Sequence, residues 1–109
     1  MAMLSLSSIN LFATPVPIDL QVEYNDPTED QGVPQKGPVL IPEVSIEDHT
    51  LFFTTPCYGN TLRIVDEYNN IVYTTIIMFD AQVLPSTLIG NYELQIVQGC
   101  WRFYGDIVL

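Results

Sequence analysis

The sequence predicts an all-β fold, an antiparallel sandwich or barrel of seven or eight short strands. Apolar and polar residues alternate with a period of two in one segment after another, as they do in strands that bury one face. Turn-forming residues separate these segments about every ten positions, which is typical of sandwiches and barrels. No window combines the i, i+3, i+4, i+7 apolar spacing with the capping residues of an amphipathic helix.

The composition fits one acidic domain with a hydrophobic core. A length of 109 residues suits a single domain, and 48% apolar with 15% charged residues excludes a disordered chain. Thirteen acidic residues oppose Lys36, Arg63 and Arg102, which gives a net charge of −10. Three cations cannot line a phosphate-binding groove, and the negative charge repels both nucleic acid and anionic lipid headgroups. We therefore expect no nucleic-acid partner, and we interpret the acidic surface as a solvated one.

An apolar segment over residues 1–14 precedes the single domain expected over residues 15–109. It contains no acidic or basic residue, and the first charge of the chain is Asp19. The segment resembles the apolar part of an export signal, but the basic start of such a signal is missing. It is therefore either a signal remnant or an additional strand. No run reaches the ~18 apolar residues that a membrane span requires.

The first half of the domain predicts one strand, a long loop and a hairpin. Alternation over residues 16–22 predicts the strand, and the three Pro and two Gly of "YNDPTEDQGVPQKGP" predict the loop. Alternating apolar residues over 44–46 and 51–53 flank the turn "EDHT", which is typical of a hairpin.

The second half predicts five more strands. Residues 61–66 form one, with Leu62 and Ile64 on the same face, and "IVYTTII" forms the next after a turn at "DEYNN". Asn suits that turn because it tolerates positive φ better than other non-glycine residues. Both faces of "IVYTTII" are apolar or β-branched, so its inward side stays open. A short strand follows over 82–84.

The chain closes with a hairpin over residues 91–97 and 101–109. Four residues of its last strand share one apolar face: Trp101, Phe103, Ile107 and Leu109. Gly105 stands where a β-bulge is expected.

Tyr92 indicates an immunoglobulin-like sandwich. In "LPSTLIGNYELQIV", Pro85 ends one strand, Gly90 permits a corner, and Tyr92 begins the next strand. In immunoglobulin-like sandwiches a Tyr at this place forms a tyrosine corner, its hydroxyl bonded to upstream backbone. The alternative is an ordinary core Tyr. Leu94 stands where antibody domains carry Cys, so hydrophobic packing rather than an intersheet disulfide is expected to hold the sheets together.

Five segments in order, "PVPIDL", "VSIEDHTLFF", "LRIVDEYNNIVYTT", "LPSTLIGNYELQIV" and "FYGDIVL", resemble a family of small exported proteins of unknown function from Bacteroides-type gut bacteria. The resemblance covers about residues 15–109. It implies an immunoglobulin-like β-sandwich, an exported (periplasmic, cell-surface or secreted) location and no assigned activity. This chain departs from the pattern at Asn69, where Gly is expected in the hairpin turn, and in the missing basic start of the signal.

Cys57 and Cys100 form a candidate disulfide. Both fall in loops that lie at the same end of an immunoglobulin-like sandwich, and an exported location permits the bond. Closing a loop of about 44 residues would stabilise the fold by about 4 kcal/mol in the chain-entropy model. Two free thiols are the alternative.

The residues do not predict an enzyme. His49, the one histidine, lies at the tip of a predicted hairpin, about 17 Å along a strand from Cys57, and is interpreted as a solvated turn residue. No G-x-S-x-G elbow is present.

No cofactor is predicted. Asp26, Glu29 and Asp30 are loop carboxylates of the kind that calcium prefers, but their spacing does not fit a calcium loop, and they are interpreted as solvated. Zinc lacks the clustered Cys and His that it needs.

These observations favour an exported, non-catalytic module that binds an unidentified protein or glycan. Tyr58, Tyr68 and Tyr104 are candidate ligand-contact aromatics, and ordinary packing at strand edges is the alternative. A second hypothesis is an assembly subunit whose N-terminal segment adds to the sheet edge of a neighbour. That segment carries the apolar residues Leu4, Leu6, Ile9 and Leu11.

Overall fold

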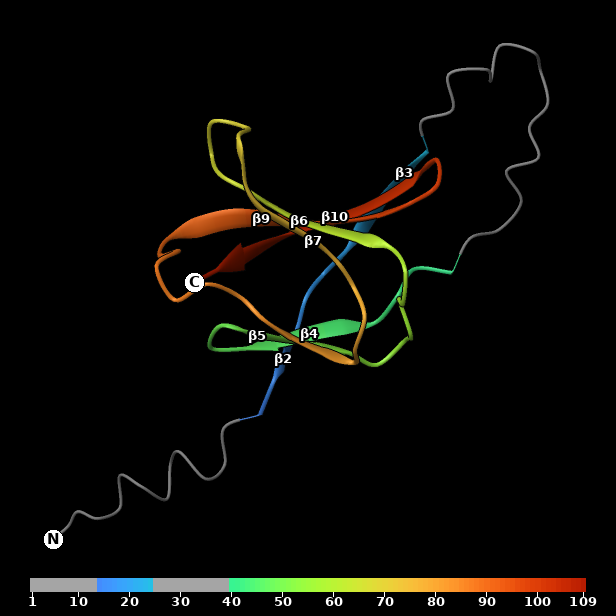
Figure 1. Ribbon diagram of the computed structural model, residues 1–109, viewed down its shortest axis with the longest axis horizontal. Coiled ribbons are helices and arrows are strands. Elements are labelled where there is room, and N and C mark those ends of the chain that lie inside the picture. Colours follow the sequence, from blue (N-terminus) through green and yellow to red (C-terminus); the bar gives the residue numbers. More distant parts are fainter. Residues whose placement is uncertain (1–13, 25–39) are drawn as a thin grey trace, which may run out of the picture.

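The computed structural model describes residues 14–24 and 40–109, which form two antiparallel sheets packed face to face (Figure 1). One sheet has the order β3-β10-β9-β6-β7 and the other β2-β4-β5-β8. The strands are β2 (Val16–Pro17), β3 (Gln21–Tyr24), β4 (Val44–Glu47), β5 (Thr50–Phe53), β6 (Thr61–Val65), β7 (Ile71–Ile76), β8 (Ala81–Val83), β9 (Asn91–Gln98) and β10 (Trp101–Val108). The predicted all-β sandwich is confirmed, with nine strands in these residues instead of seven or eight. No helix in them is long and apolar enough to cross a membrane.

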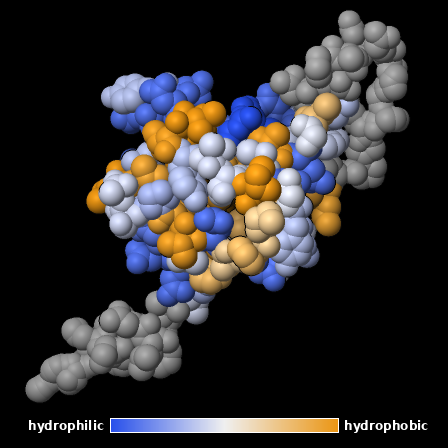
Figure 2. Space-filling model, in the orientation of Figure 1, coloured by the Kyte–Doolittle hydropathy of each residue, from blue (hydrophilic) through white to orange (hydrophobic). Residues whose placement is uncertain are grey.

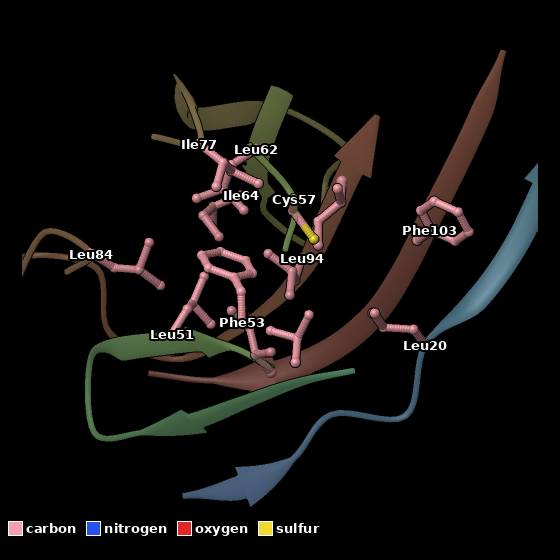
Figure 3. Close-up of a cluster of buried hydrophobic side chains, with 13 residues drawn as sticks. Leu20, Leu51, Phe53, Cys57, Leu62, Ile64, Ile77, Leu84, Leu94 and Phe103 are labelled. Atoms are coloured by element: carbon pink, nitrogen blue, oxygen red, sulfur yellow. The ribbon is translucent and has the colours of Figure 1, made fainter. Parts of the chain in front are cut away.

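One hydrophobic core fills the space between the sheets. Leu62 and Ile64 point into it from β6, as predicted, and are fully buried. The other sheet contributes Leu51 and Phe53 from β5 (Figure 3). The fully buried side chains are Leu51, Leu62, Ile64, Ile77, Leu84, Leu94, Ile96 and Phe103. Every second residue of each central strand therefore serves the same interior.

The predicted hairpins are present. β4 pairs with β5 through a turn in which Asp48 has a φ of 60°, and β9 pairs with β10 along the full length of both strands. In the turn between β6 and β7, Asn69 has a φ of 69°, the conformation for which an Asn was expected there. The long predicted loop lies outside the described residues except for its first residue, Tyr24, which ends β3.

The prediction of a single N-terminal strand over residues 16–22 is wrong, because two strands begin in this range. β2 pairs with β4 in one sheet, and β3 pairs with β10 in the other. Residues 18–20 cross from sheet to sheet, held at their start by a hydrogen bond of 2.9 Å from the Ile18 amide to the Val44 carbonyl. The period of two continues across this crossing, which is why the sequence pattern did not show it.

Gly105 allows that crossing and does not form the predicted bulge. The β9–β10 register runs without a shift through the pair of Gly105 with Leu94. A Cβ atom at Gly105 would lie 2.6 Å from the carbonyl oxygen of Asp19, so the crossing segment packs directly on the glycine backbone. The register shift in this sheet lies between β6 and β7, where Val72 is an extra residue opposite the Ile64–Val65 step.

Replacing Gly105 by Ala is expected to destabilise the fold by about 1–3 kcal/mol, because the new methyl group must displace the backbone at Asp19. Urea unfolding of Gly105→Ala against the wild type measures the change, and Asp106→Ala, on the exposed side of the same strand, is the control. Equal or greater stability of Gly105→Ala would contradict the close approach.

Candidate functional site

A groove of about 880 Å³ lies at one end of the sandwich, and we call it the end groove. It is bordered by β2 and the crossing segment, by the turn between β6 and β7, and by the paired ends of β9 and β10. Its apolar lining consists of Val16, Pro17, Ile18, Ile46, Val65, Tyr92, Ile107 and Val108. The groove thus combines residues of both sheets in a lining that is apolar in part.

The polar lining of the end groove is acidic. It consists of Asp19, Asp66, Glu67, Asn69, Asn91, Glu93 and Asp106, and no described lining residue is cationic. Glu93 accepts a hydrogen bond of 2.8 Å from the Gln95 amide group, which lies beside Arg63. The other carboxylates give the groove a strongly negative potential, because opposite charges that would neutralise it are missing from its lining.

Asp66 fixes the wall of the groove that the β6–β7 turn supplies. Its Oδ1 accepts hydrogen bonds from the backbone amides of Tyr68 and Asn70, at 2.9 and 2.8 Å. These bonds, the one from Asn70 foremost, lower the pKa of Asp66, so the carboxylate stays charged in mild acid. Asp66 therefore both shapes the turn and contributes charge to the groove.

Tyr92 lines the groove from the start of β9. Its hydroxyl donates a hydrogen bond of 3.3 Å to the carbonyl of Ile89, which is backbone three residues upstream across the corner. Gly90, in the same corner, has a φ of 123° and pairs with Leu109 through two backbone hydrogen bonds. These contacts close the end of the sandwich beside the groove.

The three candidate ligand-contact tyrosines do not come together. Tyr58 precedes β6 and Tyr68 follows it, so they lie at opposite ends of that strand, 53% and 76% exposed. The Tyr58 hydroxyl donates to Asp80, and this hydrogen bond raises the pKa of Tyr58. Tyr104 lies in the middle of the sheet, with the guanidinium of Arg102 5.5 Å from its ring centre. None of the three lines the end groove.

The structure holds Cys57 and Cys100 as free thiols, so the predicted disulfide is absent from it. Cys57 points into the core, as Figure 3 shows, and its thiol donates to the Thr55 carbonyl at 3.2 Å. Cys100 is partly exposed in the turn between β9 and β10. Burial raises the pKa of the Cys57 thiol, which keeps it protonated and unreactive.

His49 is more buried than a solvated turn residue. Its Nε2 lies 2.8 Å from the Leu88 carbonyl, and its side chain is only 22% exposed. The hydrogen bond ties the β4–β5 hairpin to the corner before β9. The four-residue strand β5, about 13 Å long, separates His49 from the loop that holds Cys57. The two side chains therefore form no catalytic pair in this structure.

The loop carboxylates Asp26, Glu29 and Asp30 lie outside the described residues. In residues 14–24 and 40–109, no group of three or more His, Cys, Asp and Glu side chains is placed to hold a metal ion. The acids of the end groove therefore line it without forming a metal centre.

The sequence pattern did not point to the end groove. A partial signal was present, since Asp66 and Glu67 end one strand, Asn91 and Glu93 begin another, and Asp106 lies near the end of the last. Neighbouring strands of an antiparallel sheet run in opposite directions, so the end of one strand lies beside the start of the next at the same end of the sheet. The contribution of Asp19 depends on the crossing between sheets, for which the sequence gives no signal.

No family model matches the chain, and no curated protein matches it. Among solved structures, it is similar to a DUF3244 family protein with an immunoglobulin-like β-sandwich fold from Bacteroides vulgatus. The two chains share 13% identity with a TM-score of 0.59, over 88% of this chain and 99% of the other. At this identity the match shows the fold, which is an immunoglobulin-like sandwich. It agrees with the resemblance to Bacteroides-type proteins of unknown function, and it assigns no activity.

The two thiols are expected to differ sharply in reactivity. Cys100 should react with iodoacetamide in the folded protein, whereas Cys57 should react only after unfolding, because it is 3% exposed and its pKa is raised. Mass spectrometry of the intact protein counts the alkylated groups before and after denaturation. A protein two hydrogens lighter that takes up no label without a reductant would instead reveal the disulfide.

Proposed function

We propose that this protein is an exported, non-catalytic interaction module, and that its end groove recognises a segment of a protein partner. The observation that carries the proposal is the groove itself, whose lining joins apolar side chains to five carboxylates. Apolar lining residues favour partner side chains that leave water, and the fixed charges beside them select the partner and its orientation. The partner is therefore basic and partly apolar.

Export is supported by the apolar N-terminal segment and by the resemblance to exported proteins. A non-catalytic role is supported by the separation of His49 from Cys57 and by the hydrogen bonds that already occupy both side chains. A glycan ligand has less support, because the exposed tyrosines do not form a shared platform and Tyr92 is the one aromatic side chain among the described lining residues.

The alternative, an assembly subunit that adds its N-terminal segment to a neighbouring sheet, involves residues 1–13, which lie outside the described part of the chain. β2, which follows that segment, is an edge strand of two residues, one of them Pro17. Because Pro lacks an N–H group, β2 offers a poor template for an added strand.

Binding is expected for a short peptide that alternates valine and lysine, and it should weaken as salt is added because exposed charges are screened beyond roughly 10 Å at 0.1 M salt. Amide chemical-shift mapping should place the peptide at Glu67, Asn91 and Asp106. Glu67→Gln with Asp106→Asn should weaken binding roughly three- to tenfold.

Glu43→Gln with Asp48→Asn removes the same charge at residues that do not line the groove, and it should bind like the wild type. A peptide of alternating valine and glutamate should not bind. Shifts spread over the whole surface, or hits on a glycan array with no peptide binding, would contradict the proposal. A pull-down from the cell envelope then identifies the natural partner.

A further inference from the structure

The edge of the five-stranded sheet at β7 is apolar and poor in charge. Ile71, Val72, Ile76, Met78 and Phe79 are all exposed, the last two by 62% and 70%. Figure 2 shows several separate groups of apolar residues on one face of the protein, so exposed apolar side chains are not rare in it. The β7 edge differs in bringing several exposed apolar side chains together along one edge strand.

Charge is missing from this region of the sequence. Between Glu67 and Glu93 the one charged residue is Asp80, whose carboxylate accepts a hydrogen bond from Tyr58. The whole chain has a net charge of −10, so two copies repel one another over most of their surface. β7 itself adds no charge to this repulsion.

The backbone of β7 has groups directed away from the sheet. Ile77 donates to Asn60 and accepts from Gly59, so its backbone groups point toward β6. Because these groups alternate in direction along a strand, those of Thr75 and Tyr73 also point toward β6. Those of Thr74 and Ile76 point outward, where β7 has no neighbouring strand among the described residues.

We propose that the β7 edge binds a second copy of this chain, with the two β7 strands antiparallel about a two-fold axis at Thr75. The bulge at Val72 limits regular pairing to residues 73–76. Within this range, centring on Thr75 lets Thr74 of each copy exchange both backbone hydrogen bonds with Ile76 of the other. This register uses every outward group of the regular segment.

The same register pairs the exposed side chains. Thr74 and Ile76 lie on the outer face of the sheet. About an axis at Thr75, each Ile76 faces Thr74 of the other copy. β-branched cross-strand pairs stabilise a sheet, and the apolar surface at the edge leaves water. A two-fold arrangement also closes the assembly at two chains.

β7 has no charged residue, and Arg63 of β6, the cross-strand neighbour of Thr74, is directed to the side chain of Gln95. A second copy therefore fits this edge better than a partner that is selected by charge. Sedimentation velocity of the full chain, from low micromolar to near-millimolar concentration, should show a monomer–dimer equilibrium. Thr74→Lys with Ile76→Lys places like charges opposite one another and should raise the dissociation constant at least about tenfold.

Thr74→Lys with Ile76→Glu places opposite charges across the axis and should restore the dimer, which tests the register. Val83→Lys with Ile89→Lys adds the same charge at exposed apolar positions outside both the β7 edge and the end groove, and should leave the dimer intact. Circular dichroism confirms that each variant is folded.

A monomer at every concentration would overturn the proposal. So would a wild-type dimer that survives Thr74→Lys with Ile76→Lys. Loss of the dimer on Leu4→Lys with Leu6→Lys in the full chain would also overturn it, and would favour strand addition by the N-terminal segment. None of these results bears on peptide binding in the end groove, so the two proposals fail separately.

Discussion

Burial of every second side chain in one shared interior is the constraint on which the rest of this structure depends. β5, β6, β9 and β10 each contribute alternate apolar residues to the core, and those side chains leave almost no exposed surface. The opposite faces of these strands do not contribute to the core and can therefore carry polar residues. The core also fixes the crossing segment, because Leu20 must enter the interior just before β3 while β2 stays in the other sheet. Gly105 makes that passage possible by leaving room for the Asp19 carbonyl.

The crossing and the strand ends together produce the end groove. Once residues 18–20 pass from one sheet to the other, Asp19 lies beside the acidic ends of β6, β9 and β10. The chain thus places five carboxylates at one end of the sandwich and no charged residue in β7. Two surfaces of different chemistry result, one suited to a basic partner and one to an uncharged copy of the same edge.

The sequence predicted local structure well and tertiary placement poorly. Alternation identified the inward faces of β6, β9 and β10, and the Asn pair identified the β6–β7 turn, because both depend on neighbouring residues alone. The split between β2 and β3 was missed because the period of two runs through it. The role of Gly105 was missed because it depends on packing against Asp19, which lies 86 positions earlier in the sequence. The sequence left the inward side of β7 open because the two faces of this strand are equally apolar. This is the pattern of an edge strand whose outer face is also apolar.

Hydrogen exchange of individual backbone amides tests this arrangement of strands around one core most directly. NMR follows the exchange at a concentration where the protein is monomeric. We expect the slowest exchange in β6 and β9, which are paired on both sides and cover the core. In β7 we expect alternation, with slow exchange of the Tyr73 and Thr75 amides and rapid exchange of the Thr74 and Ile76 amides. Uniform exchange through β7 would contradict the place of β7 at the edge of its sheet. Rapid exchange in β6 and β9 would contradict their place over the single hydrophobic core.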